Sequence, residues 1–148
     1  MLLGIPPLIS PELLKVLDEM GHGDTLVIAD GNFPAASVGR HAHVIRLDGR
    51  GGADVLKAVL ALVPIDTYDR TPVKLMDVVP GDQVETPIWD DYRELIREHD
   101  PRGDAAIGFL ERFEFYREAA NAYCVIATGE TAQYANVILR KGVVSSSV

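Results

Sequence analysis

The sequence predicts an α/β fold: one domain over residues 1–148, with a mainly parallel sheet covered by helices on both faces. Short apolar runs that are typical of buried strands alternate with segments whose apolar residues recur at helical spacing. Some of these runs, such as 123–128, are apolar throughout, as strands are when both faces of a sheet are covered. With 148 residues, 47% of them hydrophobic, the chain suits one domain that folds without metal or disulfide support.

Local signals place the elements along the chain. Ser10 and Pro11 are typical of a helix start, and Gly21 is expected to end that helix in the left-handed conformation. The serines at 145–147 form a tail that we expect to be flexible. In order, the sequence predicts a helix at 11–20, strands at 25–29 and 44–47, a helix at 53–62, a strand at 73–79, a helix from 87 to about 100, a helix at 112–122, and strands at 123–128 and 136–140.

Charge and composition exclude several classes of partner. The net charge is −8 and Lys and Arg form no cluster, so we expect no nucleic-acid partner. No apolar run approaches the ~20 residues of a membrane span, and the first seven residues lack a basic leader, so we expect neither membrane insertion nor secretion. The single cysteine, Cys124, lies in an apolar run and is predicted to be a buried hydrophobe in a reducing cytoplasm.

His22 and Asp30 are the candidate catalytic residues. His22 lies between two glycines after the first helix, and histidine exchanges protons near neutral pH. Asp30 follows the first strand, and the carboxyl ends of strands open into the crevice where α/β sheets bind ligands. We therefore predict proton-transfer chemistry on a small polar substrate. Two plainer interpretations remain: His22 ends its helix as a cap, and Asp30 caps its own turn.

The separation of these two residues along the chain carries a prediction about assembly. If residues 24–29 are extended at about 3.3 Å each, His22 and Asp30 lie roughly 20 Å or more apart at opposite ends of one strand. They cannot then share a pocket within one subunit. A common site requires His22 of one subunit to meet Asp30 of its neighbour, so the catalytic interpretation implies a homo-oligomer.

Two other patterns favour structural roles. His41 and His43 lie on the same side of an extended segment, but no further His or Cys follows at ligand spacing, so we predict surface histidines and no metal site. The glycines at 48–52 precede a helix but lack the full spacing of a phosphate-binding motif. We interpret them as a strand-to-helix turn; a phosphate- or nucleotide-binding module that uses this turn is a remote alternative.

Two segments of the second half offer hydrogen-bonding groups for a polyol. Arg112 begins a helix whose aromatic residues would usually be core, with Phe113, Tyr116 and Ala120 along one face, and its guanidinium fork suits sugar or anion oxygens. The run 134–136 places a phenol, backbone groups and an amide in a row, which suits hydroxyls. Core packing and turn packing are the alternatives for these segments.

Seven segments distributed over nearly the whole chain carry a resemblance to known proteins: SPELL at 10–14, MGHGD at 20–24, ADGNFPA at 29–35, RFEFY at 112–116, TGE at 128–130, YAN at 134–136 and LRKG at 139–142. Together they resemble the family of ribose pyranase and L-fucose mutarotase, often written RbsD/FucU. The segments near Asn32 and Arg112 look more like the fucose branch than the ribose branch. Two departures are Ala135, where the fucose branch often has glycine, and Gly31-Asn32, where it has Ala-His.

The resemblance implies an RbsD-like fold and a cofactor-free isomerase that interconverts the α and β anomers of a free monosaccharide, L-fucose above all. His22 would be the proton donor, and the sugar would contact Asp30, Arg112, Tyr134, Ala135 and Asn136. The family forms ring-shaped oligomers, commonly decamers of two pentamers, with sites between subunits. The alternatives are a D-ribose pyranase and a non-enzymatic sugar-binding accessory of a transport or catabolic system.

Overall fold

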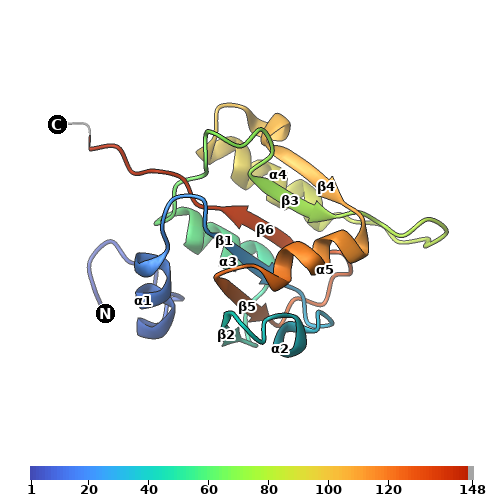
Figure 1. The fold of residues 1–148 in the computed structure, drawn as a ribbon, viewed down its shortest axis with the longest axis horizontal. Coiled ribbons are helices and arrows are strands. Elements are labelled where there is room, and N and C mark those ends of the chain that lie inside the picture. The colour runs from blue at the N-terminus through green and yellow to red at the C-terminus, as the bar shows by residue number, and fades with distance from the viewer. Residues whose placement is uncertain (147–148) are drawn as a thin grey trace.

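The structure, a computed structural model, describes residues 1–146; Ser147, which belongs to the predicted tail, and Val148 lie outside the described residues. Helices and strands alternate along most of the chain (Figure 1). The elements are α1 Pro11–Glu19, β1 Thr25–Ala29, α2 Ala35–Val38, β2 His43–Leu47, α3 Gly52–Leu60, β3 Val73–Met76, α4 Ile88–His99, the 3-10 helix η1 Gly103–Ala106, β4 Ile107–Leu110, α5 Arg112–Ala120, β5 Cys124–Thr128 and β6 Val137–Arg140.

A six-stranded sheet with the order β2-β5-β1-β6-β3-β4 forms the centre of the molecule. The strands β2, β5 and β1 run parallel to one another, and so do β3 and β4. Between these two groups lies β6, which is antiparallel to both β1 and β3. The predicted α/β fold with a mainly parallel sheet is confirmed. The reversal of β6, which the sequence did not predict, brings the start of this strand to the edge where β1 and β3 end.

Helices cover both faces of the sheet, as predicted (Figure 1). On β1, Leu26 and Ile28 pack into a hydrophobic cluster with α1, α3 and α4. Val27 and Ala29 point to the other face and pack with α2 and α5. This alternation follows from the two-residue period of a strand. Since burial of one Leu or Ile side chain contributes about 1.5–3 kcal/mol, both clusters hold β1, and with it the residues that follow it, in place.

Three elements of four residues each were not predicted: α2, η1 and β4. Four residues are too few to produce a periodic pattern of apolar side chains. The strand β3 ends at Met76 rather than at 79 because its parallel neighbour β4 ends opposite it, at Leu110. The other predicted elements are present, with bounds that differ by a few residues.

The face of α5 that packs on the sheet differs from the prediction. Its buried residues are Phe115 and Ala119. Phe113 is 60% exposed, Tyr116 is half-buried and Ala120 is exposed. Apolar residues occur on more than one side of this helix, so their spacing alone did not identify the side that meets the sheet.

Of the two predictions about the ends of α1, one is confirmed and the other is wrong. The Ser10 hydroxyl accepts a hydrogen bond from the Leu13 N–H at 3.1 Å, which confirms the predicted cap. The helix ends at Glu19, and Gly21 does not adopt the left-handed conformation; Gly23 does, with φ of +87°. The chain therefore turns towards β1 immediately after His22.

Cys124 is buried in β5, and its burial raises the pKa of the thiol to about 12. The prediction of a small buried hydrophobe is therefore confirmed. Within residues 1–146, none of the helices combines the length and the apolar character that a membrane crossing requires.

Candidate functional site

A cavity of about 440 Å³ opens at the edge of the sheet where β1 and β3 end and β6 begins. The carboxyl ends of strands are the usual ligand-binding edge of α/β sheets. Four of the predicted site residues lie in this cavity, together with six residues that were not predicted. The lining consists of Asp30, Asn32, Phe33, Met76, Asp82, Arg112, Tyr116, Gln133, Tyr134 and Asn136.

Asp30 brings a buried carboxylate to the cavity, with 6% of the residue exposed. The carboxylate accepts hydrogen bonds from the Asn32 N–H and from the Asn136 side-chain amide, both at 3.0 Å. The Asp30 N–H donates in turn to the Asn136 side-chain oxygen at 2.8 Å. Burial raises the pKa of Asp30, although these hydrogen bonds act in the opposite direction. Asp30 therefore caps its own turn and also presents a carboxyl group with raised basicity to the cavity.

Arg112, the first residue of α5, lines the same cavity. Its Nε donates to the Tyr116 hydroxyl at 3.1 Å. Its guanidinium lies over the rings of Phe113 and Tyr116, 5.7 and 5.5 Å from their centroids. Stacking and the hydrogen bond orient the guanidinium, whose other N–H groups are suited to the oxygens of a ligand.

Tyr134 is held from two directions. Its backbone φ is +56°, and no other non-glycine residue among 1–146 has a positive φ. The Trp89 indole of α4 donates to its carbonyl at 2.8 Å, and its own hydroxyl donates to the Asp82 carboxylate. This hydrogen bond to Asp82 raises the pKa of the Tyr134 hydroxyl, which therefore stays protonated at neutral pH.

Ala135 differs from its two neighbours because its side chain is fully buried in the core and does not line the cavity. Its carbonyl accepts a hydrogen bond from the buried Tyr92 hydroxyl at 2.7 Å. The hydrogen bond from its backbone N–H acts to lower the pKa of Asp30, against the effect of burial. The methyl group of Ala135 is thus not part of the cavity lining, where the predicted contact with a sugar would need it. Only the backbone of this residue lies near the site.

His22 lies outside the cavity, in the turn that precedes β1. Its Nε2 is 3.0 Å from Oδ1 of Asp66, and its ring lies against the ring of Tyr68 at a tilt of 50°, with the ring centroids 5.1 Å apart. The imidazole is 46% exposed, whereas the Asp66 side chain is 4% exposed. Because His22 and Asp30 flank opposite ends of β1, one chain does not bring them together.

Asp66 is a buried carboxylate that remains ionised. Burial acts to raise its pKa, but hydrogen bonds from the N–H groups of Tyr68 and Asp69 and from His22 outweigh it, so the pKa lies below its ordinary value. An ionised carboxylate only accepts hydrogen bonds. The Nε2 of His22 therefore carries the proton in this pair, and Nδ1 is left for another partner.

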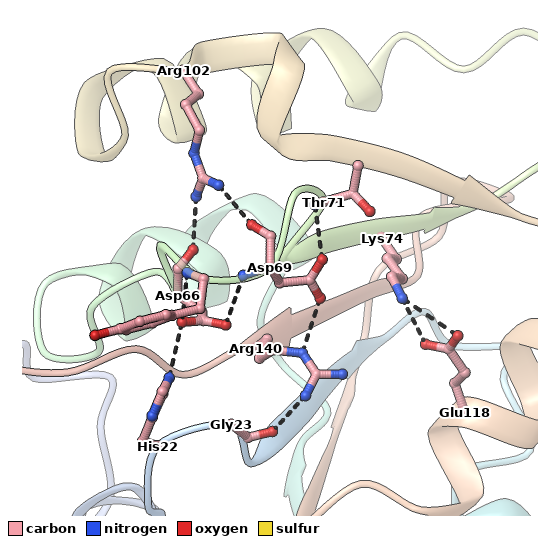
Figure 2. A network of polar contacts seen from close by, with 10 residues as sticks. His22, Gly23, Asp66, Asp69, Thr71, Lys74, Arg102, Glu118 and Arg140 are labelled. Carbon is pink, nitrogen blue, oxygen red and sulfur yellow. Dashed lines mark hydrogen bonds and ion pairs between the residues drawn. The ribbon is translucent and has the colours of Figure 1, made fainter.

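Two arginines fix the loop that carries Asp66 (Figure 2). Arg102 donates to the carbonyl oxygens of Asp66 and Asp69, both at 2.7 Å, and pairs with the buried carboxylate of Asp100 at 2.7 Å. Arg140, at the end of β6, joins this loop to the turn of His22: it donates to the Asp69 carboxylate and to the Gly23 carbonyl, both at 3.0 Å.

The remaining patterns lie in structural positions. His41 and His43 are exposed, as predicted. Within residues 1–146, no group of three or more His, Cys, Asp and Glu side chains is placed to hold a metal ion. The glycines at 48–52 form the turn into α3, where the Gly52 N–H donates to the Glu130 carboxylate at 2.9 Å. The position that a phosphate would take at this helix is thus filled by the chain's own carboxylate.

Sequence reasoning missed Asp66 and Asp82 for different reasons. Asp66 meets a histidine 44 residues away, and no spacing in the sequence indicates such a pairing. Asp82 follows Pro80 and Gly81, and this sequence is typical of an ordinary polar turn. Tyr116 was noted on one face of its helix and Phe33 only as part of the segment 29–35, and only the three-dimensional arrangement places them beside Asp30.

Comparison with known proteins identifies relatives of the whole chain. Residues 3–144 match the RbsD / FucU transport protein family. Fucose mutarotase of Homo sapiens is 48% identical, over 96% of this chain and 94% of the human protein. The crystal structure of FucU from Bifidobacterium longum is 67% identical with a TM-score of 0.95, over 96% of this chain and 99% of that one. Fucose mutarotase from Streptococcus pneumoniae, solved in complex with L-fucose, is 46% identical with a TM-score of 0.90, over 97% of this chain and all of that one. The chain therefore belongs to the RbsD/FucU family.

Proposed function

We propose that the protein is a cofactor-independent L-fucose mutarotase, an isomerase that interconverts the α and β anomers of the free sugar. The observation that carries this proposal is the L-fucose complex of the Streptococcus pneumoniae protein, whose chain superposes on this one with a TM-score of 0.90. The cavity supports it independently, because a carboxylate, a guanidinium, a phenol and an amide converge there. Such a set matches the donors and acceptors of a polyol.

The reaction consists of proton transfers only. A base removes the proton of the anomeric hydroxyl while an acid protonates the ring oxygen, the bond between C1 and the ring oxygen breaks, and the open aldehyde forms. Rotation about C1–C2 and the reverse steps close the ring on the other face. One acid and one base therefore suffice, each contributing about 10²- to 10⁴-fold.

Asp30 is our leading candidate for the base. Its burial raises its pKa, which makes its carboxylate a stronger proton acceptor than an exposed one. Asn136 and the Asn32 N–H hold the carboxylate in a fixed orientation at the cavity. Arg112 and Tyr134 are proposed to bind the sugar hydroxyls, and Ala135 is proposed to contribute its backbone.

His22 is our candidate for the acid, oriented by Asp66. Since Nε2 donates to the Asp66 carboxylate, Nδ1 is the nitrogen available to the ring oxygen, and it can protonate that oxygen when the imidazole carries a proton on both nitrogens. In the opposite assignment, His22 removes the proton of the anomeric hydroxyl and Asp30 protonates the ring oxygen, and the two groups exchange roles when the ring closes.

We propose that each active site combines the cavity of one subunit with His22 of its neighbour. The position of His22 beyond the other end of β1 and its exposed ring support such sharing. A ring-shaped homo-oligomer, a decamer of two pentamers, is the assembly that we propose. We propose the cytoplasm as its location, which the buried free thiol of Cys124 suits.

Exchange NMR on L-fucose tests the activity. The protein should accelerate exchange between the α and β anomer signals, and His22→Ala should abolish the acceleration while L-fucose still binds. His41→Ala, which removes another exposed histidine, is the matched control and should retain full activity.

Three other outcomes would contradict the proposal in distinct ways. Binding of L-fucose without faster exchange would identify a sugar-binding accessory. Faster exchange of D-ribose but not of L-fucose would identify a ribose pyranase. Thermal stabilisation by sugar phosphates or nucleotides, and by no free sugar, would point to the remote phosphate-binding alternative.

A further inference from the structure

The loop between β3 and α4, residues 77–87, reaches the cavity through a single side chain, Asp82. The loop extends beyond the ends of β3 and β4 (Figure 1). Near its tip, Gly81 has a φ of +96° and the Asp82 N–H donates to the Val79 carbonyl at 3.0 Å. This tight turn directs the exposed carboxylate of Asp82 towards the cavity, which is formed mainly by the sheet and α5.

Asp82 is tied to the cavity by Tyr134. The Tyr134 hydroxyl donates to Oδ2 of Asp82 and lies 3.4 Å from the Val79 N–H, so one phenol contacts both sides of the turn. Tyr134 makes this contact from a disfavoured backbone conformation, which the Trp89 indole helps to hold. Backbone strain of this kind, imposed by surrounding elements, is typical of functional sites.

We propose that Asp82 is a sugar-binding residue that determines specificity: its Oδ2 holds Tyr134, and its Oδ1 accepts a hydrogen bond from one hydroxyl of the sugar. Among residues 1–146, hydrogen bonds reach Oδ2 and not Oδ1. A carboxylate only accepts hydrogen bonds, whereas the guanidinium of Arg112 in the same cavity only donates them. Together they select a sugar with hydroxyls at two defined positions, since a ligand without one leaves a polar group unpaired. This inference rests on the proposed function.

The test compares Asp82→Asn and Asp82→Ala with the wild type. L-fucose exchange measured over a range of sugar concentrations gives kcat and KM, and fluorescence of Trp89, the chain's single tryptophan, gives the Kd without reference to activity. Loss of a hydrogen bond to a charged group should raise KM and Kd about 10-fold or more. The kcat should change less than about threefold, because Asp82 is assigned no proton transfer.

Asp77→Asn is the matched control. Asp77 lies in the same loop, and its carboxylate accepts a hydrogen bond from the neighbouring Val78 N–H at 2.9 Å, but it does not line the cavity. This variant should leave kcat, KM and Kd unchanged. If it raised KM as much as Asp82→Asn does, the effect would come from the loop as a whole and the proposal would be wrong.

A series of monodeoxy L-fucoses distinguishes a direct contact between Asp82 and the sugar from an indirect effect of Asp82 through Tyr134. If Asp82 accepts from one hydroxyl, the ratio of variant to wild-type Kd should fall to about 1 for the one sugar that lacks that hydroxyl. An equal ratio for every sugar would mean that Asp82 acts only through Tyr134, which overturns the proposal, as would an unchanged Kd for L-fucose. If the wild type binds L-fucose without catalysing exchange, the mutarotase function fails, while the Kd comparison still decides the role of Asp82.

Discussion

Asp30 and Asp66 are both buried carboxylates, yet their pKa values shift in opposite directions. Burial dominates at Asp30 and raises its pKa. At Asp66, hydrogen bonds from two backbone N–H groups and from His22 outweigh burial and lower the pKa. A base is more effective when its pKa is raised, and a group that orients an imidazole must stay ionised. The two environments therefore suit the two roles proposed for these residues.

The raised pKa of Asp30 predicts how stability depends on pH. Between the unfolded pKa near 3.8 and the higher folded value, the folded state binds more protons than the unfolded state, so Asp30 makes the protein less stable as pH rises through this window. In Asp30→Asn this contribution is absent. Urea denaturation at fixed protein concentration should show that the free energy of unfolding of the variant, relative to wild type, increases as pH rises from about 3.5 to 5.5.

Asp66→Asn is the control of opposite sign. Its lowered folded pKa stabilises the protein above the unfolded pKa, and this contribution is lost as pH falls through the folded pKa. The stability of this variant relative to wild type should therefore decrease as pH rises from the lowered folded pKa to the unfolded value near 3.8, which is below the pH window of Asp30. Equal slopes for the two variants would contradict the assignment of the shifts to these residues.

Single residues were predictable from sequence where a local rule applies. The cap of Ser10 and the turn of Asp30 depend on neighbours within three residues, and both are present. The partner of His22 was not predictable, because Asp66 reaches it only through tertiary folding. The burial of Ala135 was missed for the same reason: Tyr92, 43 residues away, draws its carbonyl into the core.

At the scale of elements, the loop between α3 and β3 depends on Arg102. Removal of its guanidinium leaves the Asp100 carboxylate, 4% exposed, without its charged partner and releases two backbone carbonyls. We expect Arg102→Gln to lose about 1.5–3 kcal/mol of stability. Because Asp66 shifts with this loop, kcat for anomer exchange should fall by up to about 100-fold while KM changes little. Exchange NMR and urea denaturation measure the two effects.

Arg97→Gln provides the comparison for Arg102. Arg97 also forms a two-point contact with a carboxylate, that of Asp104 at 2.9 and 2.7 Å, but both partners are more than half exposed and neither touches the loop of Asp66. Exposed pairs contribute about 0–1 kcal/mol. A loss of kcat in Arg97→Gln as large as that in Arg102→Gln would show that Arg102 has no particular role in positioning Asp66.

Elements were predicted best where the apolar pattern is unbroken. The continuous apolar runs of β1 and β5 and the helical spacing of apolar residues in α4 are such patterns, and the bounds of these elements differ from prediction by at most a few residues. The direction of β6 was not predictable, because a buried strand has the same apolar composition in either direction. The edge strand β4 contains Gly108 and the exposed Phe109, and it lacks the pattern of a buried strand.

At the scale of the whole molecule, the shared site predicts complementation between inactive subunits. His22→Ala and Asp30→Asn should each be inactive alone. When they are unfolded together in equal amounts and refolded, one site in four should combine His22 from one subunit with Asp30 from another, which gives about one quarter of the wild-type exchange rate. Exchange NMR on the mixture measures this recovery.

A second mixture serves as its control. The double variant His22→Ala/Asp30→Asn refolded with an equal amount of wild type should retain about one quarter of the wild-type rate per subunit if sites are shared, and about one half if each chain is self-sufficient. If the mixture of the two single variants recovered no activity and the control mixture retained half the rate, each chain would contain its own site.

The reversed strand β6 ties two distant places to one short piece of backbone. Asn136, immediately before the strand, bonds to Asp30, and Arg140, its last residue, bonds to the Gly23 carbonyl beside His22. A slip of one residue along β1 would turn every side chain of β6 to the opposite layer and break both attachments together. Sliding of this strand therefore cannot disable the cavity while sparing the histidine turn, so only side-chain substitutions can separate the two.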